Sequence, residues 1–97
     1  MNLITPIKPL FPLGRIVQTQ GVLALGLSAQ TYDSLFARHV LGYWREMSAD
    51  DQTANEKSVL DGDRIISRYT IPGTTTRVWI VTEADRSLTT LLLPHEY

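Results

Sequence analysis

The last third of the chain alternates short runs of β-branched and aromatic residues with turn residues. Three runs have the composition of strands, at residues 64–71, 76–82 and 88–93. A Pro-Gly turn separates the first two runs, residues 83–87 separate the second from the third, and a proline follows the third. Connections this short join antiparallel neighbours, so the pattern predicts an antiparallel sheet of consecutive strands.

The residues before this sheet show helical periodicity. Ser28 is suited to the N-cap of a helix that Gly42 ends, and the apolar face of this helix consists of Tyr32, Leu35, Phe36, His39 and Val40. A second helix is predicted from Ser48 to about Asp61. Its apolar residues are few, so most of its surface must face water or a partner.

The first residues of the chain have no helical pattern. Residues 1–13 contain three prolines and indicate an extended N-terminal arm. Residues 15–19 have the composition of an edge strand, and residues 21–27 that of a short apolar helix. We therefore expect a single α+β domain over residues 14–97, with two or three helices packed on a three- or four-stranded antiparallel sheet.

Composition and charge exclude several classes of protein. A net charge of −1 gives no basic field for phosphate backbones, so nucleic acid is not a favoured partner. The absence of cysteine rules out disulfides and thiolate sites, and it favours a cytoplasmic location. No apolar run is long enough for a membrane span, and no glycine-rich phosphate loop or paired histidine spacing is present, so we expect no membrane, cofactor or metal. A chain of 97 residues buries a small core, and a homodimer would enlarge it.

The most polar cluster of the sequence is the connection at residues 83–87. In a catalytic interpretation Glu83 or Asp85 acts as a general base and Arg86 stabilises a developing anion. In a structural interpretation Asp85 and Ser87 form turn hydrogen bonds while Arg86 pairs with a carboxylate. The structural interpretation is favoured, because acids in turns more often support the turn than catalyse.

Two further sets of residues are candidates. His39 lies on the apolar face of its helix, where we expect a neutral imidazole bonded to a backbone carbonyl rather than a catalytic base. Arg64, Arg68 and Arg77 are expected to lie along one face of the sheet. Together with Arg86 and Ser87 they form a candidate binding row, but pairing of the three arginines with the acidic segment from Asp50 to Asp63 is the favoured interpretation.

The segment from Thr76 to Tyr97, TRVWIVTEADRSLTTLLLPHEY, resembles a family of short, uncharacterised proteobacterial proteins. Members are associated with plasmids and other mobile elements, and some are labelled as type I restriction subunits. Further matches lie upstream, at residues 11–14, 39–44, Asp51, Asn55 and 67–69. In the family pattern the tryptophan is flanked as Gly-Asp-Trp-Gly, whereas Tyr43 and Arg45 flank Trp44 here. The resemblance implies a mobile-element context and supplies no catalytic residues to carry over.

Two functions follow as hypotheses. The first is a small accessory protein of a mobile element that acts by binding another protein, such as a defence or restriction component. The second is a metal-independent ribonuclease toxin, with His39 or Glu83 as base, Arg77 and Arg86 holding phosphate, and Tyr97 nearby. The near-neutral charge weighs against the ribonuclease.

Overall fold

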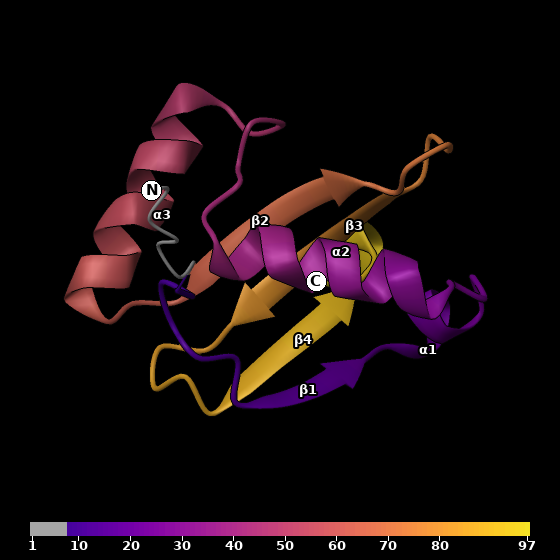
Figure 1. The fold of residues 1–97 in the computed structure, drawn as a ribbon, viewed down its shortest axis with the longest axis horizontal. Coiled ribbons are helices and arrows are strands. Elements are labelled where there is room, and N and C mark those ends of the chain that lie inside the picture. Colours follow the sequence, from indigo (N-terminus) through magenta and orange to yellow (C-terminus); the bar gives the residue numbers. More distant parts are fainter. Residues whose placement is uncertain (1–7) are drawn as a thin grey trace, which may run out of the picture.

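The computed structural model of the protein describes residues 8–97, which form three helices on one mixed four-stranded sheet (Figure 1). The strands are β1 (Arg15–Gln18), β2 (Ile65–Thr70), β3 (Arg77–Thr82) and β4 (Leu88–Leu92). The helices are α1 (Gln20–Leu23), α2 (Ala29–Val40) and α3 (Ala49–Asp61), and a 3₁₀ turn, η1 (Pro94–Glu96), ends the chain. The predicted α+β class is confirmed.

The sheet has the strand order β1-β4-β3-β2, and one of its pairs departs from the prediction. Strands β2, β3 and β4 form the expected antiparallel meander. Strand β1 is parallel to β4, with Arg15 opposite Leu88 and Gln18 opposite Leu91, so the expectation of a wholly antiparallel sheet is wrong at this edge. The reason lies in the connection: all three helices and the strands β2 and β3 separate β1 from β4 in the sequence, and a connection of that length allows a parallel neighbour.

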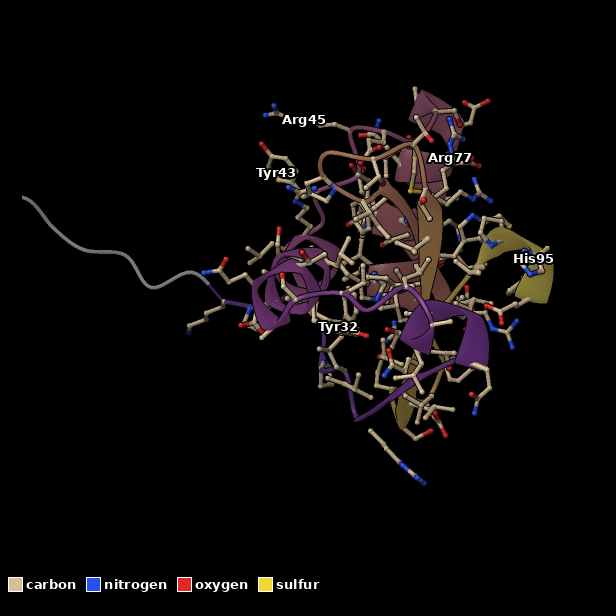
Figure 2. All side chains as sticks on the ribbon, turned by 90° about the vertical axis from the view of Figure 1, so that its right-hand side faces the viewer. Tyr32, Tyr43, Arg45, Arg77 and His95 are labelled. Carbon is tan, nitrogen blue, oxygen red and sulfur yellow. The ribbon has the colours of Figure 1, made fainter. Side chains whose placement is uncertain are left out.

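Helix α2 covers one face of the sheet, as Figure 2 shows with the sheet seen edge-on. Ser28 caps the helix as predicted, because its side chain accepts a hydrogen bond from the Thr31 amide. Leu35 and His39 point inward and are fully buried. They pack on the side chains of the sheet that alternate toward α2, which makes this side the hydrophobic core.

The other face of the sheet is covered at its centre by the chain's C-terminus. Turn η1 packs on β3, and the Tyr97 ring lies 5.2 Å from the Trp79 ring. The Arg68 guanidinium stacks over the same tryptophan at 4.8 Å. Trp79 and Ile80, which are adjacent in β3, are therefore both covered, one on each face.

The predicted N-terminal arm begins outside the described residues, and its last part packs against the domain. The Leu10 amide donates to the Val40 carbonyl at 2.8 Å, and Phe11 is 5% exposed. The Phe11 ring stands edge-on to His39 with 5.0 Å between centroids. Phe11 and Leu13 therefore contribute to the core. Within residues 8–97, no helix combines the length and apolar character needed to cross a membrane.

Candidate functional site

The polar connection between β3 and β4 is held together by its own side chains. Asp85 accepts from the Ser87 amide at 3.0 Å and from the Ser87 hydroxyl at 2.6 Å, which is the predicted turn bonding. These two bonds lower the pKa of the Asp85 carboxyl. A general base near neutral pH needs a raised carboxyl pKa, so the direction of this shift opposes the catalytic interpretation.

Arg86 does not pair with a carboxylate, contrary to the structural interpretation of the sequence. Its guanidinium donates to the backbone carbonyls of Asp63 at 2.6 Å and Ser58 at 3.0 Å, and more weakly to that of Glu83 at 3.3 Å. Arg86 also has a φ of 61°, a left-handed conformation that is uncommon outside glycine. The guanidinium thus fastens the end of α3 to the β3–β4 turn, and both of its terminal nitrogens already donate hydrogen bonds.

His39 is the centre of a chain of buried hydrogen bonds. Its Nδ1 lies 2.5 Å from the Ser67 hydroxyl, and its Nε2 lies 2.7 Å from the Thr82 hydroxyl. The Trp44 indole donates to the same Ser67 oxygen at 2.8 Å. Thr82 in turn contacts the Thr89 hydroxyl at 2.7 Å. The sequence analysis expected a backbone carbonyl as the histidine's partner, and the structure provides two hydroxyl groups instead.

The direction of each hydrogen bond follows from the groups at the two ends of this network, the Leu13 carbonyl and the Trp44 indole. Thr89 donates its only hydroxyl proton to the Leu13 carbonyl at 2.7 Å, so it must accept from Thr82. Thr82 has then used its proton and must accept from His39 Nε2–H. Ser67 accepts from the indole and gives its own proton to Nδ1. The network is fully satisfied only with a neutral imidazole protonated at Nε2.

Burial reinforces this protonation state. His39 is 0% exposed, and desolvation, with a contribution from the Arg86 charge, lowers its pKa to about 3. A base that no substrate can reach and that already has both ring nitrogens engaged cannot abstract a proton. The Ser67–His39–Thr82 group therefore has a structural role, because it joins α2 to β2 and β3, and Thr89 extends it to Leu13 of the arm.

The three arginines of the predicted binding row lie along the face of the sheet opposite α2. Arg68 and Arg77 share this face by strand register, since Thr70 is opposite Arg77 and Arg68 is opposite Trp79. Arg68 forms an ion pair with Asp51 of α3 at 2.7 Å, which is the predicted neutralisation.

Arg64 is engaged from two sides. It pairs with Glu83 at 2.9 Å and donates to the Tyr97 hydroxyl at 3.0 Å. Arg77 is exposed and forms no ion pair with any residue from 8 to 97. The row is therefore mostly neutralised by contacts within the chain.

The two edges of the sheet differ. At the β2 edge, the Asn55 side chain of α3 donates to the Ile66 carbonyl at 2.8 Å and accepts from the Ile66 amide at 3.3 Å. The Glu46 carboxylate accepts from the Thr70 amide at 3.0 Å. These side chains take the place of a neighbouring strand and protect this edge from pairing with another chain.

The β1 edge has no such cover in the described part of the chain. The Arg15 amide donates to the carbonyl of Ser87, just before β4, and the Thr19 amide donates to Leu91 of β4. The alternation of the strand therefore turns the amides and carbonyls of Ile16 and Gln18 outward. No side chain from residues 8–97 donates to or accepts from these outward groups. Ile16 is 50% exposed. This is an open strand edge.

A groove runs along the open edge, between β1 and α2. It has a volume of about 380 Å³ and is lined by Ile16, Val17, Gln18, Tyr32, Asp33 and Phe36. The Tyr32 hydroxyl donates to the Gln18 side chain at 2.6 Å and bridges helix and strand, and Figure 2 shows Tyr32 in this position. The exposed Asp33 carboxylate has no ion-pair partner in residues 8–97. We call the outward groups of β1 and this cavity the β1 groove.

Sequence reasoning missed the β1 groove and the hydroxyls of the His39 network. For the network a signal was present: Ser67, Thr82 and Thr89 have the same strand parity as the buried apolar residues, so each is a polar residue at an inward position. The groove had no comparable signal, because residues distant in sequence form it. Within residues 8–97, no group of histidine and acidic side chains is arranged to hold a metal ion. The chain matches no protein-family model, no curated protein and no solved structure with which it was compared.

Proposed function

We propose that this chain binds an extended segment of another protein, which adds as a fifth strand beside β1 in the β1 groove. The observation that carries the proposal is the contrast between the two sheet edges. Asn55 and Glu46 satisfy outward groups of Ile66 and Thr70 in β2, whereas Ile16 and Gln18 present theirs to the groove.

The chemistry of the β1 groove indicates the kind of segment that fits. Backbone donors and acceptors of the outward residues are complementary to those of a strand, which supplies affinity without sequence preference. Side chains that alternate toward α2 would meet Ile16 and Phe36 and should be apolar. The unpaired Asp33 carboxylate favours a lysine or arginine in the segment.

The proposal also includes a biological setting. On the resemblance of the C-terminal segment, the chain is an accessory protein of a mobile genetic element, and its partner is a component of a defence or restriction system. A cytoplasmic location belongs to the same proposal and is supported by the cysteine-free sequence. The buried His39 and the engaged Arg86 give no support to the ribonuclease alternative.

A selection from a phage-displayed library of random peptides, with the full chain as bait, tests the proposal. We expect the enriched peptides to alternate apolar residues and to contain a basic residue. Their affinity should fall at least about tenfold for Ile16→Pro, which removes one outward amide and one apolar contact. A proline favours the extended conformation of the preceding residue and is compatible with an edge strand, so the fold should persist.

Two variants complete the design. Asp33→Asn should weaken only those peptides that contain the basic residue. Leu60→Lys changes an 86% exposed leucine on α3 and should leave binding unchanged. Peptides that bind the native chain and Ile16→Pro equally would contradict the proposal. Protection of the Ile16 amide that rises with protein concentration alone would instead assign the edge to a second copy of the chain.

A further inference from the structure

A second cavity lies at the other end of α2, away from the β1 groove. It has a volume of about 200 Å³ and is lined by Arg38, Tyr43, Arg45, Glu46 and Tyr69. Arg38 comes from the last turn of α2, Tyr69 from β2, and the others from the loop between α2 and α3. Figure 2 shows Tyr43 and Arg45 projecting together from this end of the molecule, and the guanidinium lies 4.7 Å from the Tyr43 ring centroid. We call this the arginine cavity.

Both guanidinium groups of the arginine cavity lack an anionic partner. Neither Arg38 nor Arg45 forms an ion pair with a residue from 8 to 97, and residues 1–7 contain no acid. The acid of the cavity is Glu46, whose Oε1 accepts from the Thr70 amide at 3.0 Å. Two positive charges thus face one carboxylate that is already hydrogen-bonded to the backbone.

The third feature is a buried hydroxyl without a partner. Tyr69 is 2% exposed, and its Oη forms no hydrogen bond with any described residue. The nearby Ser67 hydroxyl is engaged by Trp44 and His39. Burial raises the pKa of Tyr69 to about 12, while the nearby Ser67 hydroxyl and the charge of Arg38 oppose this rise and the charge of Glu46 adds to it. Arg38 and Glu46 both lie in the cavity wall. A buried neutral donor without an acceptor is costly in a folded protein, so an acceptor is expected at this position.

We propose that the arginine cavity binds a phosphate group, either as free phosphate or as a small phosphomonoester. Two guanidinium groups from different elements can donate to a tetrahedral oxyanion from two sides, and the Tyr69 hydroxyl supplies a further donor. A phosphate dianion balances the two arginine charges. The volume of about 200 Å³ leaves room for the anion and for water beside it. The site is independent of the β1 groove.

Titration of the full chain with inorganic phosphate, against sodium chloride of equal ionic strength, tests this site. Calorimetry and the thermal midpoint should report saturable binding and stabilisation. Arg38→Met and Arg45→Met should each weaken the phosphate affinity at least about tenfold. Arg15→Met is the matched control, since Arg15 is exposed, unpaired within residues 8–97 and outside the cavity, and it should bind as the native chain does.

Two conservative variants separate binding from folding. Tyr69→Phe removes only the unpartnered hydroxyl, so without phosphate it should unfold at the same temperature as the native chain or higher, while its phosphate affinity falls several-fold. Glu46→Gln keeps an oxygen acceptor for the Thr70 amide and removes the repelling charge, so it should bind phosphate more tightly.

Titrations with inorganic phosphate and with O-phosphoserine show whether the cavity takes free phosphate or a phosphomonoester. Saturable binding of either ligand, with the variant effects given above, supports the proposal. The proposal fails if neither ligand gives saturable binding. It also fails if Arg38→Met, Arg45→Met and Arg15→Met respond to phosphate equally, which would identify a general salt effect.

Discussion

At the scale of single residues, His39 makes the stability of the fold depend on pH. Its pKa is about 3 in the folded chain and near 6.5 when unfolded. Between these values the unfolded chain binds a proton that the folded chain does not, so stability falls as the pH falls. We expect the free energy of unfolding to drop by about 1.4 kcal/mol per pH unit below about pH 6 from this residue.

Urea unfolding at a series of pH values measures this slope. His39→Gln should reduce it, whereas His95→Gln, which changes an exposed histidine, should not. Equal slopes for the native chain and His39→Gln would show that the imidazole is accessible to protons in the folded state.

The hydrogen bonds of the buried hydroxyl groups lead to a second prediction, which compares the stability effects of substituting two neighbouring threonines of β4. Thr89 is fully buried and bonds to Leu13 and Thr82, whereas Thr90 points to the opposite face. Thr89→Val should cost about 2 kcal/mol, because a buried carbonyl and a buried hydroxyl lose their partner. Thr90→Val should stay within about 0.5 kcal/mol of the native chain. Chemical denaturation measures the free energy of unfolding of both variants. Equal losses at the two positions would contradict this role of Thr89.

At the scale of elements, the protection of the β2 edge is testable through Asn55. Asn55→Ala leaves the Ile66 amide and carbonyl without their partner, so we expect a loss of about 2 kcal/mol and self-association at high protein concentration. Glu56→Ala, the exposed neighbour on α3, is the control. Analytical ultracentrifugation and denaturation measure the two effects, and an Asn55→Ala variant that stays monomeric and stable would contradict this role.

The start of β1 is positioned by a glycine that approaches another backbone. Gly14 and Gly73 both have positive φ, of 64° and 78°. A Cβ at Gly14 would lie 2.4 Å from the Arg86 carbonyl oxygen, whereas one at Gly73 would meet nothing within 4 Å. We expect Gly14→Ala to cost at least about 3 kcal/mol and Gly73→Ala about 1 kcal/mol, by thermal unfolding. Similar costs would mean that the contact between Gly14 and the β3–β4 turn is loose.

Some of the helices, caps and strand pairings could be predicted from the sequence, and others could not. Helix α2, the N-caps Ser28 and Ser48, and the β2–β3–β4 meander follow from local patterns, because capping, periodicity and short turns are properties of neighbouring residues. The parallel pairing of β1 depends on the path of the whole chain. The partners of Arg86 were also missed, since backbone carbonyls can accept from a guanidinium and every residue has one, so they carry no sequence signal.

At the scale of the whole molecule, the chain is asymmetric. One edge of the sheet is closed by α3 and by Glu46, and the other edge is open along α2. The closed edge explains how a small domain with an exposed sheet avoids indiscriminate pairing. The open edge directs pairing to one place, which is the central claim of the proposed function.

Amide hydrogen exchange followed by NMR compares the two edges most directly. In the free protein the Ile16 and Gln18 amides should exchange quickly and the Ile66 amide slowly, because only Ile66 has a partner. With a selected peptide bound, the Ile16 and Gln18 amides should become protected while Ile66 is unchanged. Protection of Ile16 and Gln18 in the free monomer, or peptide binding that leaves both amides exchanging quickly, would contradict strand addition at β1.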